Sequence, residues 1–131
     1  MSDFSYYIRT YFEERADSEY ASFSAKLIPN IEPDSILGVR IPIIRAFAKE
    51  IKNNENIGSF FREVPHKYHE ENILHAILIN NIKTPDDALS EIEKFLPYIT
   101  NWAVSDTLSP KCLNTNTRAH KEVFNKWIKS K

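Results

Sequence analysis

Apolar side chains recur three and four residues apart along almost the whole of this 131-residue chain, which is the spacing of one helical face. No segment shows the strict apolar–polar alternation that predicts a half-buried strand. The sequence contains only two glycines, Gly38 and Gly58, so few positions favour a break in helical structure. These features together predict an all-α fold.

Residues that cap or start helices divide this pattern into segments. Asp17 and Asn101 can each accept hydrogen bonds from a first helical turn, and Pro42 and Pro85 fit that turn because it needs no backbone donor there. The predicted helices cover residues 3–15, 17–27, 43–53, 57–64, 68–82 and 84–98, followed by one that Asn101 caps and Pro110 ends and one that begins at 116 or 117.

The apolar stripes of these helices predict the core. In the second helix Tyr20, Phe23 and Leu27 share one face, and we expect them to be buried. The helix over 68–82 has so broad an apolar arc that we expect neighbours on more than one side. The stripes of the first and third helices are Phe4, Tyr7, Ile8, Tyr11 and Phe12, and Ile44, Phe47, Ala48 and Ile51.

Short connections between successive helices favour antiparallel pairs. Pairs begin near Asp3, Pro42, His66 and Asn101, a loose period that is typical of HEAT-like repeats. We therefore expect a single all-α domain over residues 1–131, in which antiparallel helical pairs stack as a HEAT-like curved solenoid. A compact irregular bundle is the alternative, because the side-chain identities do not repeat.

Charge and hydropathy argue against several classes of protein. The formal net charge of −1 does not suit a strongly basic nucleic-acid binder, although the segment 111–131 is locally basic. No apolar run reaches the length of about 18 residues that predicts a membrane span. The N-terminus lacks the layout of a signal peptide, so a cytoplasmic location is expected.

The cysteine and histidine content gives no metal site. Cys112 is the only cysteine, so it has no partner for an internal disulfide. His66 and His69 lie three residues apart, but no third ligand with suitable geometry follows, and we interpret them as a surface cluster. His75, inside the most apolar helix, is expected to be hydrogen-bonded and partly buried.

Trp102 and Asp106 lie four residues apart, so a helix places them on one face. An indole ring attracts positive charge and a carboxylate stabilises it, so the pair suits a cationic, planar ligand. For two such residues taken alone, a core or groove-lining tryptophan and a solvated aspartate are the simpler interpretation.

Three segments follow one another in an order and spacing that carry a family resemblance. They read LGVRIPIIR at 37–45 with AKEI at 48–51, PHKYHEEN at 65–72 leading into LHA at 74–76, and FLPY at 95–98 with NW at 101–102 and DTLSPK at 106–111. Together they resemble the DNA alkylation repair (AlkD-like) family of HEAT-like-repeat DNA glycosylases.

The resemblance implies excision of positively charged, N-alkylated purines from duplex DNA by hydrolysis of the N-glycosidic bond, without a metal or an organic cofactor. Family catalysis uses a tryptophan and an aspartate at this helical spacing, and these fall on Trp102 and Asp106. Asp106 would stabilise the charge that develops on the deoxyribose and position the attacking water. Trp102 would pack against the sugar and the damaged nucleotide.

Four basic residues are candidates for contact with DNA phosphates: Arg40, Arg45, Lys111 and Arg118. Arg118 lies upstream of the family's phosphate-binding arginine, so it is not assigned that particular role. For Arg40 and Arg45, capping, pairing with acids or solvation is the simpler interpretation. For Lys111 and the basic tail that contains Arg118, a DNA-facing surface and a solvated terminal helix fit the sequence about equally well.

Two departures from the family pattern suggest an alternative function. Position 103 is alanine, where relatives often carry an acidic residue beside the tryptophan. The family also continues beyond the segment that resembles 127–131. We therefore expect the N-terminal portion of a family domain, with an exposed apolar C-terminal edge that favours self-association. The alternative is a catalytically inactive HEAT-like module that binds nucleic acid or another protein.

Overall fold

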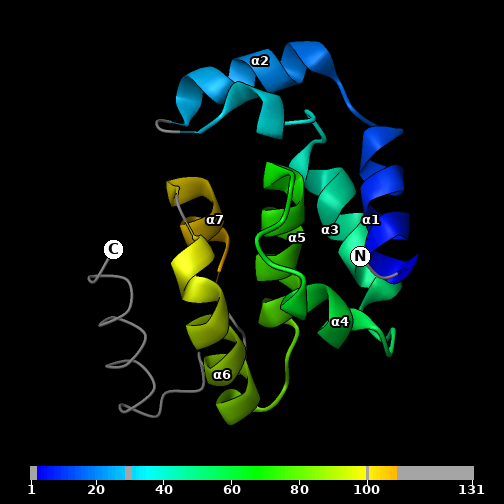
Figure 1. The fold of residues 1–131 in the computed structure, drawn as a ribbon, viewed down its shortest axis with the longest axis vertical. Coiled ribbons are helices and arrows are strands. Elements are labelled where there is room, and N and C mark those ends of the chain that lie inside the picture. The colour runs from blue at the N-terminus through cyan, green and yellow to red at the C-terminus, as the bar shows by residue number, and fades with distance from the viewer. Residues whose placement is uncertain (1–2, 29–30, 100, 109–131) are drawn as a thin grey trace.

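The computed structural model describes residues 3–28, 31–99 and 101–108, apart from the side chain of Trp102 (Figure 1). These residues form helices and no strand, which confirms the predicted all-α class. In chain order the elements are α1 (Asp3–Glu13), α2 (Ser18–Leu27), η1 (Pro33–Ser35), α3 (Ile41–Ile51), α4 (Ile57–Arg62), α5 (His69–Asn80), α6 (Pro85–Phe95), η2 (Leu96–Tyr98) and α7 (Trp102–Thr107). The helix expected from residue 116 onward lies outside the described residues. No helix in the described ranges is long and apolar enough to cross a membrane.

The helices begin close to where the sequence predicts, because local residues satisfy the first turn. Asp17 Oδ1 accepts hydrogen bonds from the backbone N–H groups of Glu19 and Tyr20, at 3.0 and 3.2 Å. Asn101 Oδ1 accepts one from the backbone N–H of Val104 at 3.1 Å. A proline occupies the first turn of both α3 and α6, where a missing N–H has no cost.

The central helix of the fold is α5. It packs against α1, α3, α6 and α7, and its side chains are buried almost all the way round, as its broad apolar arc predicts. The chain runs in opposite directions in α1 and α3, and again in α5 and α6 (Figure 1). The core is filled mainly by aliphatic side chains and by four phenylalanines that are at most 1% exposed, Phe12, Phe47, Phe60 and Phe95.

Two predicted stripes are less buried than expected. The predicted burial of Tyr20, Phe23 and Leu27 is wrong: no residue of α2 is buried, and Phe23 and Leu27 are each 56% exposed. Tyr7 in the stripe of α1 is also 51% exposed. The physical reason for the exposure of Phe23 and Leu27 is the placement of α2, which lies across one end of the other helices and packs mainly against η1 (Figure 1). Its apolar face therefore lacks a neighbour that would cover it.

Candidate functional site

A cleft of about 380 Å³ lies between α2, α3, α5 and α7 and brings together two of the residues predicted for the site, Asp106 and Arg45. Its lining is mainly apolar, with a few polar side chains among the aliphatic ones. The principal lining residues are Tyr20, Ser24 and Leu27 from α2, Ile41, Ile44 and Arg45 from α3, His69, Glu70 and Ile73 from α5, and Ala103, Asp106 and Thr107 from α7.

Asp106 is exposed near the end of α7, a helix that is fixed at both ends. At its start, Asn101 caps the free backbone donor of Val104. At its end, Asn80 Nδ2 from α5 donates to the backbone carbonyl of Thr107 at 2.8 Å. Because Val104 is also buried in the core at 1% exposure, the helix holds Asp106 at the cleft without relying on the aspartate itself.

The other predicted site residues are only partly placed. Trp102 is the first residue of α7, one turn before Asp106, but its side chain lies outside what the structure describes. Lys111 and Arg118 lie outside the described residues altogether. Arg45 is exposed and lines the same cleft as Asp106 of α7.

Arg40 is exposed but makes contacts within the protein. Its Nη2 lies 3.6 Å from Asp17 Oδ2, and its guanidinium carbon lies 4.5 Å from the centre of the Tyr20 ring. Both partners belong to α2 or its cap, so Arg40 ties the start of α3 to α2. A phosphate contact from Arg40 would compete with this pair.

Two residues in the first turn of α5, Glu70 and His69, line the cleft and were not among the predicted site residues. Glu70 is only 3% exposed, yet its carboxylate accepts hydrogen bonds from three successive backbone N–H groups. The donors are Leu37 at 3.0 Å, Gly38 at 2.9 Å and Val39 at 3.2 Å. The only local signal is a pair of acids at the start of an apolar helix, which is typical of an ordinary helix N-terminus.

His69 connects the same turn to α7. Its Nδ1 lies 3.5 Å from Asn101 Nδ2, a long contact with the residue that caps α7. Burial lowers the pKa of His69, against the raising effect of the neighbouring Glu70 carboxylate. The imidazole is therefore neutral near pH 7, and its Nδ1 can accept a hydrogen bond from the Asn101 amide.

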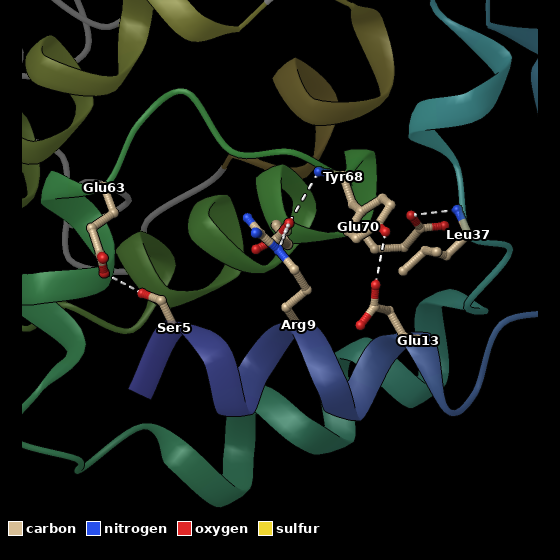
Figure 2. A network of polar contacts seen from close by, with 8 residues as sticks. Ser5, Arg9, Glu13, Leu37, Glu63, Tyr68 and Glu70 are labelled. Atoms are coloured by element: carbon tan, nitrogen blue, oxygen red, sulfur yellow. Dashed lines mark hydrogen bonds and ion pairs between the residues drawn. The ribbon is translucent and has the colours of Figure 1, made fainter. Parts of the chain in front are cut away.

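A row of three polar side chains on α1, spaced four residues apart, contacts the segment 63–71 (Figure 2). The pairs are Ser5 Oγ with Glu63 Oε2, Arg9 Nε with Glu71 Oε1 at 3.4 Å, and Tyr68 Oη, which donates to Glu13 Oε2 at 2.8 Å. Burial raises the pKa of Glu71, and Arg9 acts in the opposite direction. This network borders a separate polar cavity of about 270 Å³ and locks α1 to the start of α5.

The histidines do not form the surface cluster that their spacing suggests. His69 is buried at 8% exposure, and His66 Nε2 lies 2.8 Å from Nδ1 of the buried His75. The His75 ring stacks between Phe61 and Phe95, at centroid distances of 4.5 and 3.8 Å. Burial lowers the pKa of His66 to about 4 and that of His75 to about 2. Among the described residues, no group of three His, Cys, Asp or Glu side chains has the arrangement of a metal site.

A comparison of the sequence with protein families identifies the family to which this chain belongs. The family described as DNA alkylation repair enzyme matches residues 8–131, which include every element that lines the cleft. Searches among curated proteins and among solved structures returned no match to the chain. Because the match extends over nearly the entire sequence, the chain belongs to the DNA alkylation repair enzyme family.

Proposed function

We propose that this protein is a DNA glycosylase that hydrolyses the N-glycosidic bond of positively charged, N-alkylated purines in duplex DNA. The observation that carries the proposal is the position of Asp106, an exposed carboxylate on a helix fixed at both ends, at the rim of a cleft in a protein of the DNA alkylation repair family. Arg45 on the same rim suits the negatively charged backbone of the substrate.

The chemistry follows from the charge of the substrate. An N-alkylated purine carries a formal positive charge, and cleavage of the C1′–N9 bond moves the bonding electron pair onto the base, which leaves neutral. The positive charge then develops on the deoxyribose, where the Asp106 carboxylate would stabilise it. Water adds to C1′ and loses a proton, for which Asp106 is the nearest base in this proposal, and the products are a free base and an abasic site.

The size of this effect can be bounded. Opposite unit charges 4 Å apart near a protein surface interact by about 4 kcal/mol. An interaction of that size, made only in the transition state, corresponds to roughly a thousandfold in rate. In the same proposal, Trp102 packs against the sugar and the damaged nucleotide, and no metal or organic cofactor is needed.

The DNA-binding surface is part of the proposal. In this proposal Arg45, which lines the cleft, contacts a DNA phosphate, and Arg40, Lys111 and Arg118 are the further candidates. We propose that successive antiparallel helices, of which α5 and α6 are one pair, are units of a HEAT-like stack within a single domain over residues 1–131. The proposed self-association edge lies outside the described residues.

The decisive experiment measures release of 7-methylguanine from methylated duplex DNA by the wild-type protein, Asp106→Asn and Asp86→Asn. Asp86 is an exposed aspartate in the first turn of α6 that does not line the cleft, so it controls for the loss of one negative charge. We expect Asp106→Asn to lower the release rate by a factor of roughly a hundred to a thousand, and Asp86→Asn to leave it within about twofold.

Binding measurements separate the proposed glycosylase from its alternative. Salt-dependent binding to duplex DNA without base release would favour a non-catalytic nucleic-acid-binding module. Absence of DNA binding at low salt would contradict both DNA-directed functions and leave a protein-interaction module.

A further inference from the structure

We propose that Glu70 is a positioning residue that fixes the α2 wall of the cleft relative to Asp106. The catalytic consequence of this proposal rests on the glycosylase function proposed above, whereas its structural consequence does not. The proposal comes from the path of hydrogen bonds that leads from the centre of the fold to both sides of the cleft.

The Glu70 carboxylate is buried and bound to the backbone of the loop 37–39. Glu70 is 3% exposed and accepts hydrogen bonds from the successive backbone N–H groups of residues 37–39, at 2.9 to 3.2 Å. The contact with Leu37 is visible in Figure 2. Bonds from backbone donors to a carboxylate are roughly twice as strong as neutral ones, and a buried anion without them would be costly. Glu70 therefore fixes the loop 37–39 to α5, although the loop lies 31 to 33 residues before Glu70 in the sequence.

The loop 37–39 in turn contacts Asp17, the residue that caps α2. The backbone N–H of Asp17 donates to the Leu37 carbonyl at 3.0 Å. Gly38 has φ +91°, and a Cβ there would lie 1.9 Å from the Asp17 carbonyl oxygen, so only glycine allows this approach. Arg40, directly after the loop, adds the contacts to Asp17 and Tyr20. The loop 37–39 thus links the Glu70 carboxylate of α5 to the start of α2.

The cleft depends on the position of α2. Tyr20, Ser24 and Leu27 of α2 line it, although no residue of α2 is buried in the core. Hydrogen bonding to the loop 37–39 and packing against η1 therefore hold this wall in place. The adjacent residue, His69, contacts the cap of α7. One turn of α5 therefore contacts both the loop that binds the start of α2 and the residue that caps the helix carrying Asp106.

The neighbouring carboxylate supplies a matched control. Glu71 is 1% exposed, accepts a hydrogen bond from the Tyr68 backbone N–H at 3.0 Å and pairs with Arg9. It borders the polar cavity beside α1 and does not line the cleft. Glu70→Gln and Glu71→Gln are therefore equally small changes at equally buried sites, and only the first removes acceptor capacity from the loop 37–39.

The experiment measures amide hydrogen exchange and base-release kinetics for both variants. For Glu70→Gln we expect exchange of the α2 amides, relative to those of α6, to be at least tenfold faster than in the wild type. We also expect KM for methylated duplex DNA to rise about tenfold while kcat changes less than threefold. For Glu71→Gln we expect the α2-to-α6 exchange ratio and KM to stay within about twofold.

Different outcomes contradict different proposals. An unchanged α2-to-α6 ratio in Glu70→Gln, or the same change in Glu71→Gln, would overturn the positioning role. Faster exchange of the α2 amides in Glu70→Gln with an unchanged KM would overturn the proposed effect of Glu70 on the reaction. If the wild type releases no base, the glycosylase proposal fails, and the exchange ratio still decides whether Glu70 positions α2. If Glu70→Gln does not fold, Gly38→Ala tests the same path, since its added methyl group must displace Asp17 while Glu70 stays intact.

Discussion

Phe47 and Phe23 have the same side chain, but their surroundings differ. Phe47 is fully buried, and its ring centroid lies 4.0 Å from that of Tyr11 and 5.4 Å from that of Phe12. Phe23, on α2, is 56% exposed. We expect Phe47→Ala to lower the free energy of unfolding by about 3–5 kcal/mol, because a buried aromatic leaves a cavity. Phe23→Ala should change it by about 0.5 kcal/mol or less. Urea unfolding of the two variants measures both values.

This contrast shows what sequence periodicity does and does not contain. Both phenylalanines occupy the apolar face of an amphipathic helix, so the pattern predicts burial for each. Periodicity reports which residues share a face, while burial also requires a neighbouring element that covers it. A loss of several kcal/mol in Phe23→Ala would mean that the α2 face is covered in solution.

At the scale of the element, α7 depends on its cap. A helix of six residues is too short to be stable alone, so its ends and its buried side chains hold it in place. Asn101→Ala removes the acceptor for the Val104 N–H, and we expect a loss of about 1 kcal/mol in the free energy of unfolding together with slower base release. Asn101→Asp keeps a capping oxygen and should retain most of the stability. Equal losses in both variants would contradict a role for the cap.

The helix starts were predictable because they depend on local chemistry. Asp17 and Asn101 cap the helices that follow them, and the helix ends lie within three residues of their predicted positions. The meeting of Asp106 and Arg45 at one cleft follows from tertiary packing, which periodicity alone does not specify. Glu70 could not be identified at all, because its partners lie 31 to 33 residues away and an acid near a helix start is ordinary.

At the scale of the whole molecule, buried titratable groups couple folding to pH. Burial holds the pKa of His66 at about 4 and that of His75 at about 2, and it also lowers the pKa of His69. In the unfolded chain each would titrate near 6.5. Between pH 6.5 and about 4 the unfolded state therefore binds more protons than the folded state, so the free energy of unfolding falls as the pH falls.

The magnitude of this dependence is about 1.4 kcal/mol per pH unit for His66 and again for His75. Glu71 acts in the opposite direction: burial raises its pKa above the usual value of 4.5, so its contribution to stability is lost as the pH rises through the raised pKa. One carboxyl group can offset at most about one histidine. His66 and His75 therefore leave a net slope of the same sign, and we expect stability to fall on acidification well before most carboxylates are protonated.

Urea unfolding between pH 4.5 and 6.5 tests this coupling with two variants. His75→Gln keeps a group that can hydrogen-bond to His66 but removes a titrating imidazole, so the slope should decrease by about 1.4 kcal/mol per pH unit. Leu74→Ala, at a fully buried neighbouring position, should lower stability by about 2–5 kcal/mol at every pH and leave the slope unchanged. An unchanged slope in His75→Gln would mean that the folded protein protonates His75 as readily as the unfolded chain does. That result would be incompatible with an imidazole stacked between Phe61 and Phe95.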